Sequence, residues 1–335
     1  MREGDYPALK ASFAPWIKDL TLLIPNTRAL GSWSVLAAAT SCAMTHTTPG
    51  APDRIHIGPV SRFAERSITE SSGVAVSRQF PGVIWTHNDG GSGPLVYATD
   101  TMGRNHGSFV VADVRNIDWE AMAIGACGDH QCLYLGDVGD NKVRRESVTI
   151  YRIREPTPQS PVADSALPIT GVERLEFRYP DGPRDVEAIY VDPGGGIYLI
   201  TKTTKEAVLR YRLPATWWDQ KDSRTAEPLG PFPIDPGTSR LAAVTGADLS
   251  LDGSMLVVRT YRELFFYAVE ADGHVGDGPM ATCPILGIES QGEAVAWLDD
   301  RRVVLTSERG VMGRGTIMVV HCQLSASASQ TGAVP

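Results

Sequence analysis

Five segments of this chain repeat one pattern, and the repetition limits the possible folds more than any other feature of the sequence. Three copies read polar residue, any residue, Glu, Ala and then alternating apolar residues: DWEAMAI from Asp118, DVEAIYV from Asp185 and QGEAVAW from Gln291. Two looser copies are ESSGVAV from Glu70 and TGADLSL from Thr245. Each copy is followed by a second apolar run with a polar end and by a third short run rich in β-branched and aromatic residues, which is typical of β-strands joined by turns.

The repeats begin roughly 46 to 67 residues apart, which suits the four-stranded blades of a β-propeller. We predict an all-β, five-bladed β-propeller over residues 53–325. Fourth strands can be recognised after four of the repeats, and the segment from Arg54 to Phe63 is expected to supply the fifth, closing the ring and hiding its open edge. A six-bladed ring is the alternative if residues 156–170 or 215–240 contain further strands. A β-sandwich would not need repeats in phase.

The composition fits one globular β-domain and argues against a nucleic-acid partner. Apolar residues make up 42% of the 335 residues, which is enough to build a core, and 33 Gly and 23 Pro supply turns. The net charge of −8 would repel a phosphate backbone. We therefore expect no nucleic acid among the partners, and we expect a monomer.

The first 52 residues lack the repeat and are expected to be a leader and linker. The segment TRALGSWSVLAAATSC has a basic residue, a small apolar run and then Cys42, as in a secretory or lipoprotein signal. The residues before it fit poorly unless the true start lies further along, and an ordinary leader is the alternative. The expectation is an exported protein, whether periplasmic, surface-anchored or secreted, with membrane contact through a lipid on Cys42. Residues 326–335 are expected to be a disordered tail.

The cysteine count agrees with an oxidising compartment. If Cys42 carries a lipid, four cysteines remain, and an even number is what such a compartment favours. Cys127 and Cys132 bracket a turn and could form a hairpin staple, while Cys283 and Cys322 could pair at the outer rim. Free core thiols are the alternative. A zinc site is disfavoured because the His residues are scattered.

The acids of the repeats converge on the propeller axis. First strands line the central channel, and residues two apart point the same way. One ring would contain Glu70, Asp118, Asp185, Thr245 and Gln291, and a deeper ring Ser72, Glu120, Glu187, Ala247 and Glu293. Glutamates so close repel each other unless they are protonated or bridged by a cation. An oxygen-only ligand set, with Ala247 contributing its carbonyl, predicts a Ca2+ site; a water-filled channel is the alternative.

These inner strands resemble those of the calcium-activated nucleotidase (apyrase) family of five-bladed propellers. Ser72, Glu120, Glu187 and Glu293 match that family's calcium ligands, whereas Ala247 departs from it, since the resemblance implies a Ser there. The likeness covers roughly a tenth of the chain and includes none of the family's nucleotide-binding segments. The chain is also similar to bacterial secreted propellers of the phytase-like and SdiA-regulated families.

Polar residues at the ends of the second strands are expected to surround the acid rings, because a first strand starts where the second ends. From them we predict the following catalytic residues: His87, Asp89, Asp137, Asp140, Lys202, Arg259, Tyr261, Arg262 and Glu308. Lys202, Arg259 and Arg262 would clamp an anionic ligand, while His87, Asp89 or Asp137 handles water. The alternative is that these side chains pair with each other as salt bridges.

Three functions follow from these expectations. The first is a metal-dependent hydrolase acting on a small anionic, phosphoester-type substrate. The second is a non-catalytic cell-surface propeller that uses a structural calcium ion and binds a cell-envelope ligand. A glycosidase with paired carboxylates is a third. No G-x-S-x-G nucleophile motif is present to separate them.

Overall fold

The structure is a computed structural model that describes residues 55–160, 165–219, 224–235, 237–309 and 314–324. These residues belong to one compact unit, Gly50–Pro335. The predicted leader with Cys42 and the predicted tail lie outside the described residues. Within the described part, the two helices are short 3-10 turns, η1 (Ala215–Asp219) and η2 (Arg240–Ala242), and neither could span a membrane.

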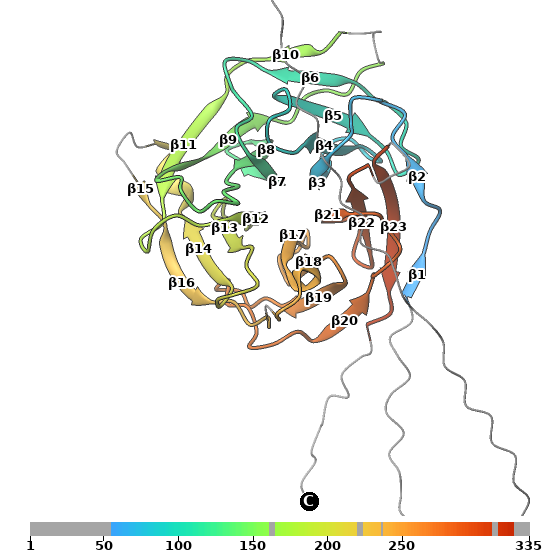
Figure 1. Cartoon of the computed structure of the whole chain (residues 1–335). Coiled ribbons are helices and arrows are strands. Elements are labelled where there is room, and N and C mark those ends of the chain that lie inside the picture. Colours follow the sequence, from blue (N-terminus) through green and yellow to red (C-terminus); the bar gives the residue numbers. More distant parts are fainter. Residues whose placement is uncertain (1–54, 161–164, 220–223, 236, 310–313, 325–335) are drawn as a thin grey trace, which may run out of the picture. The chain divides into compact units, whose positions relative to one another are not determined.

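Five sheets stand around a central axis as the blades of a propeller, as predicted (Figure 1). The first blade contains β3 (Ser71–Val76), β4 (Ile84–Asn88), β5 (Leu95–Thr99) and β6 (Ser108–Val111). The second contains β7 (Trp119–Cys127), β8 (His130–Asp137), β9 (Val148–Arg154) and β11 (Glu173–Arg178). The third contains β12 (Val186–Val191), β13 (Ile197–Thr201), β14 (Leu209–Leu213) and β16 (Glu227–Pro231). The fourth contains β17 (Val244–Leu249), β18 (Met255–Thr260), β19 (Glu263–Ala268) and β20 (Ala281–Pro284).

The fifth blade is completed by the start of the described chain. Its own strands are β21 (Gly292–Trp297), β22 (Arg302–Ser307) and β23 (Thr316–Cys322). Both β1 (Ile55–Ile57) and β2 (Ser61–Arg62) pair antiparallel with β23. The segment from Arg54 to Phe63 was predicted to play this part, and the pairing confirms it.

The two long segments that could have hidden a sixth blade form straps between neighbouring blades instead. β10 (Leu167–Ile169) leaves the second blade and pairs in parallel with β6 of the first. β15 (Arg224–Thr225) leaves the third blade and pairs in parallel with β11 of the second. Each strap covers an outer edge that would otherwise be open.

Burial follows the position of each strand in its blade. The inner strand β12 is buried along its whole length, because it packs against the inner strands on both sides and against β13. The outer strand β11 has buried residues only at Leu175 and Phe177, which alternate with exposed charged ones. The cores lie between blades; one of them packs Tyr134 and Phe177 of the second blade against Tyr211 of the third.

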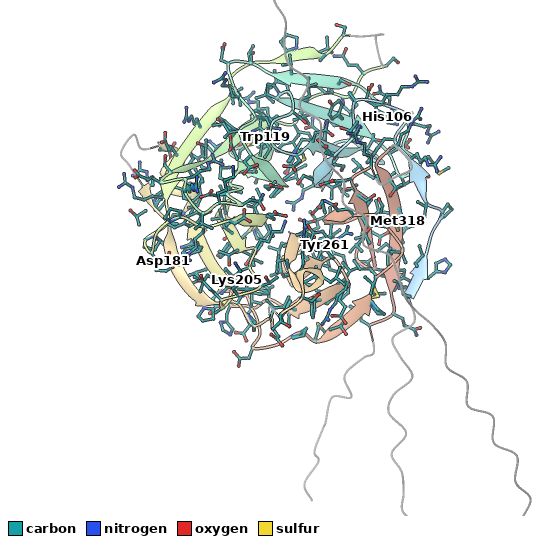
Figure 2. All side chains as sticks on the ribbon, viewed as in Figure 1. His106, Trp119, Asp181, Lys205, Tyr261 and Met318 are labelled. Atoms are coloured by element: carbon teal, nitrogen blue, oxygen red, sulfur yellow. A yellow bond between two sulfur atoms is a disulfide. The ribbon has the colours of Figure 1, made fainter. Side chains whose placement is uncertain are left out.

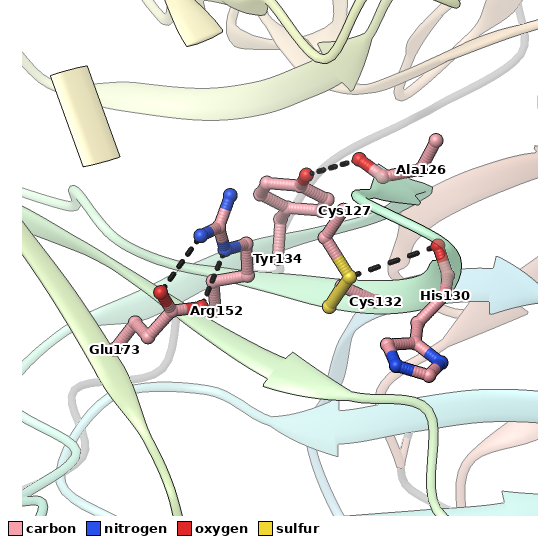
Figure 3. The surroundings of a disulfide bond; sticks show 7 residues. All are labelled: Ala126, Cys127, His130, Cys132, Tyr134, Arg152 and Glu173. Carbon is pink, nitrogen blue, oxygen red and sulfur yellow. Dashed lines mark hydrogen bonds and ion pairs between the residues drawn. A yellow bond between two sulfur atoms is a disulfide. The ribbon is translucent and has the colours of Figure 1, made fainter. Parts of the chain in front are cut away.

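Two disulfides have the predicted pairing. Cys127 and Cys132 staple the turn between β7 and β8, and the neighbouring Tyr134 hydroxyl donates to the Ala126 carbonyl at 2.8 Å (Figure 3). Cys283 on β20 and Cys322 on β23 join the fourth blade to the fifth, with their Cα atoms 6.1 Å apart. The second bridge therefore ties the last blade to its neighbour at the outer rim.

Candidate metal centre

Each of the five inner strands carries a β-bulge at the same place, and the bulged residues form the acid ring. The pairing with the second strand skips one residue in every blade: Ser72, Glu120, Glu187, Thr245 and Glu293. The ring is therefore hydroxyl, Glu, Glu, hydroxyl, Glu. Bulges re-aim side chains and are frequent at functional sites.

This register corrects one predicted ligand. Ala247 lies two residues beyond the bulge, in an apolar layer with Val74, Met122, Ile189 and Val295. The fourth repeat must be shifted by two residues, so that Thr245 takes the place assigned to Ala247. The nucleotidase-like pattern implied a hydroxyl at that place, and Thr245 supplies it.

Hydrogen bonds link the ring residues to each other and to side chains at the mouth of the central channel, which is formed by the residues that follow the second strands. The Ser72 hydroxyl donates to Glu120 Oε2 at 3.0 Å, and the Lys202 ammonium contacts Glu187 Oε1. Tyr261, which is labelled near the middle of the propeller in Figure 2, donates to Glu293 Oε1 at 3.3 Å. Lys202 thus brings a positive charge into contact with the ring.

Two oxygens of the ring are left without a partner. Thr245 Oγ1 is buried and makes no hydrogen bond within the described residues. Glu293 Oε2 is buried as well, and Glu308 is the neighbouring group that could donate to it when protonated. A void of about 10 Å3 lies between the ring and the apolar layer, where Ser72, Glu187 and Thr245 line it. It has room for about one water-sized occupant.

Burial and mutual repulsion raise the pKa values of the acids around this ring. Burial outweighs the Lys202 charge and raises the pKa of Glu187 to about 8. Burial, with Glu293 and Asp89 nearby, raises the pKa of Glu308 to about 7. Burial alone would lower the pKa of Lys202, but the surrounding acids outweigh it and raise that pKa. Lys202 therefore stays charged, and Glu187 is the member of the pair that titrates.

Two more carboxylates, Asp89 and Asp118, stand just above the ring beside its member Glu120. Asp89, Asp118 and Glu120 each offer an oxygen within 4.8 Å of the others, and burial raises the pKa of Asp118 to about 6. Gly90 and Gly139 close around Asp118, and a Cβ at either glycine would collide with its side chain. The mouth therefore concentrates negative charge.

Four of the predicted catalytic residues reach this mouth, and they occupy equivalent positions. Asp89, Lys202, Tyr261 and Glu308 each come directly after the last residue of a second strand. The fifth equivalent is Val138, which carries no polar group. One rule, the residue after the second strand, therefore selects the side chains that meet the ring.

His87 and Arg259 do not reach the mouth, because both lie inside their second strands at the position opposite the residue after the bulge. His87 is fully buried against Trp119, with ring centroids 5.4 Å apart, and burial lowers its pKa. Arg259 is buried between the fourth and fifth blades, where it pairs with Glu289 and donates to the Ala294 carbonyl at 2.7 Å. Their side chains point toward the next blade instead of the axis.

Asp137, Asp140 and Arg262 also have other partners. Asp137 is fully buried and pairs with Arg145 at 2.7 Å. Asp140 accepts the backbone N–H groups of Arg144 and Arg145 at 2.5 and 2.6 Å, which fixes the loop after β8. Arg262 is half-exposed and pairs with Glu263 at 3.0 Å. The expected basic clamp of Lys202, Arg259 and Arg262 is therefore not assembled.

The placement of Arg259 predicts a structural effect for its loss. Arg259→Met leaves Glu289 buried without its partner, and we expect unfolding to become easier by about 3–5 kcal/mol. Urea unfolding of the full chain measures this change. Replacing both residues, Arg259→Met with Glu289→Leu, should restore most of the stability. A single variant with unchanged stability would contradict the structural role.

Sequence reasoning missed Thr245 and Glu289. The hydroxyl of Thr245 in the fourth repeat could have indicated its role. That repeat matches the others poorly, however, and the position of its bulge is not visible in the sequence. Glu289 lies in the loop before β21 and gave no signal, because the partner of Arg259 comes from another blade.

No protein-family model matches the chain. No curated protein matches it either. Among solved structures, the PQQ-bound aldose sugar dehydrogenase of Streptomyces coelicolor is 10% identical, with a TM-score of 0.43 over 82% of this chain and 100% of that one. A structural-genomics protein of unknown function from Bacteroides thetaiotaomicron is 8% identical, with a TM-score of 0.44 over 80% of this chain and 77% of that one. Likenesses this remote say nothing about activity or cofactor, and the five-bladed fold rests on the strand pairing itself.

Proposed function

We propose that this chain is a calcium-binding β-propeller, with the ion on its axis held by the five bulged residues. The observation that carries the proposal is the ring itself. Three glutamates and two hydroxyls, one from each blade, form this ring, and two of their buried oxygens make no hydrogen bond within the described residues. An ion there would cancel the repulsion between Glu120, Glu187 and Glu293.

The donor set favours calcium over other biological cations. All five side chains offer oxygen, which suits a hard cation, and none offers the nitrogen or sulfur that zinc prefers. Three carboxylates and two hydroxyls give five ligands, and bidentate carboxylates or water can raise the number to the six to eight that calcium accepts. Magnesium demands a stricter octahedron.

The ion would act chiefly as a structural tie. Each ligand comes from a different blade, so one ion would connect all five inner strands at their starting ends. The protein would then present its faces as a rigid scaffold for a cell-envelope ligand. The two disulfides support an oxidising compartment, and we propose an exported protein, either secreted or anchored through Cys42.

A metal-dependent hydrolase is the second candidate, supported by Glu308. A carboxyl group with a pKa of about 7 beside a metal ligand can take or give a proton at neutral pH. An anionic substrate would meet Lys202 and the ion, but also many carboxylates, so a neutral substrate such as a glycoside fits the mouth better than a phosphoester. Turnover of 4-nitrophenyl phosphate or 4-nitrophenyl glycosides by the calcium-loaded chain, lost in Glu308→Gln, would favour this candidate.

Calcium titration of the EDTA-treated full chain at several pH values tests the proposed site. Glu187, Glu308 and Asp118 have raised pKa values, so the folded ion-free protein holds more protons than the unfolded chain above about pH 4.5. Its stability should therefore fall as the pH rises toward 8. Calcium must displace these protons, so its affinity should increase from pH 6 to pH 8, with one ion bound per chain by calorimetry. An affinity independent of pH, or no binding, would contradict the proposed site.

A further inference from the structure

A separate cavity lies at the other end of the propeller axis. Its volume is about 820 Å3, and residues in the last half of four inner strands line it: Val76, Ile124, Leu249 and Trp297. The volume falls within the range of about 300–1,000 Å3 that is usual for small-molecule sites. The apolar layer that contains Ala247 lies between this lower cavity and the acid ring.

Carboxylates dominate the polar wall of the lower cavity. Four aspartates line it, Asp248, Asp252, Asp299 and Asp300, against one guanidinium, Arg78. Two of the four are already used: Asp252 accepts from Ser250 at 2.6 Å and from Ser254, and Asp299 pairs with Arg302. The other two remain available to a ligand.

Asp248 and Asp300 are the available acceptors. Asp248 uses one oxygen, Oδ2, to accept the Trp297 backbone N–H at 2.8 Å, and burial raises its pKa to about 6. Asp300 is exposed and accepts no hydrogen bond within the described residues; the charge of Arg302, which pairs with Asp299, also acts on it. Arg78 faces Asp248 and offsets part of its charge. The cavity as a whole keeps an excess of negative charge.

The lower cavity also presents apolar and aromatic side chains. Leu251 at its rim is 75% exposed, which is a large apolar side chain left in water. Trp297 lines the cavity, and aromatic rings attract organic cations to their faces. We propose that the lower cavity binds a small organic cation, an ammonium group carried on an apolar body. The apolar part would rest on the strand ends, and the ammonium would lie near Asp248 and Asp300.

The test uses three probes of nearly the same shape and different charge: phenethylamine, 2-phenylethanol and phenylacetate. Calorimetry on the full chain in EDTA should show the amine binding with a dissociation constant of about 1 mM, as expected for so small a ligand. The alcohol should bind at least about fivefold more weakly, and the acid should not bind. Equal binding of all three probes, or no binding of the amine at about 10 mM, would overturn the proposal.

Variants locate the site. Asp300→Asn and Asp248→Asn should each weaken amine binding about fivefold to tenfold, while Asp277→Asn, an exposed aspartate elsewhere, should leave it unchanged. Asp300 is exposed, so its variant should fold normally even if the Asp248 variant does not. Unchanged binding in Asp300→Asn would refute the assignment. Glu187→Gln should not affect the amine, which separates failure of this site from failure of the calcium site.

Discussion

Glu187→Gln is expected to remove most of the thermal stabilisation that calcium gives to this propeller. At a calcium concentration of about 1,000 times its dissociation constant, binding adds about 4 kcal/mol to the stability of the folded state. For a chain of this size that corresponds to a rise of roughly 10 °C in the unfolding midpoint. Gln keeps the shape but loses the charge that holds the ion, so the rise should shrink to a few degrees.

The control is Glu270→Gln, which removes an exposed glutamate from the fourth blade far from the ring. This variant should keep the full calcium response. The measurement is differential scanning calorimetry of the full chain in EDTA and in a calcium series. An undiminished shift in Glu187→Gln would place the ion elsewhere, and no shift in the wild type would contradict the proposed calcium site.

Lys202→Met should change calcium affinity and ion-free stability in opposite directions. Lys202 contacts Glu187 and Tyr261, and it competes with an incoming cation for the same oxygens. Without it, the ring should bind calcium about tenfold or more tightly, since a like charge has been removed. The ion-free protein should also lose stability at pH 8, because without the ammonium the pKa of Glu187 rises further and the buried carboxyl must stay protonated, without its ion-pair partner.

Lys205→Met provides the comparison, because Lys205 is exposed and lies on the third blade away from the ring (Figure 2). It should change neither quantity. Calcium calorimetry and urea unfolding in EDTA give the two measurements. A Lys202 variant that weakens calcium binding would show that the ammonium supports the site instead of competing with the ion.

The ring of blades could be predicted from the sequence because its signal is repeated. Strand alternation, turn residues and phase recur in each blade, and the missing fourth strand of the last blade pointed to Arg54–Phe63. The straps β10 and β15 could not be predicted in the same way. They are three and two residues long, and their partners are strands of another blade.

The site was predicted in part, and the errors concern which way side chains point. A bulge shifts the alternation of a strand by one residue, and the sequence does not show where the bulge lies. Thr245 was placed one layer too high, and Ala247 was given its role, because the fourth copy has no Glu to align it and was matched two residues out of register. His87 and Arg259 lie near the predicted face of the propeller, but the alternation of side chains along their strands points both toward a neighbouring blade. Asp89, Lys202, Tyr261 and Glu308 follow the strands, where each backbone turns across the mouth.

The closure of the fifth blade also determines when this protein can fold. Ile57 pairs with Val320, so β1, the first strand of the described residues, waits for roughly 260 residues before its partner exists. At synthesis rates of about 5–20 residues per second, that wait lasts about 13–50 s. During this time the ring must stay open, with unpaired strand edges exposed. A chain that closes this late needs protection from aggregation until its last strand is available.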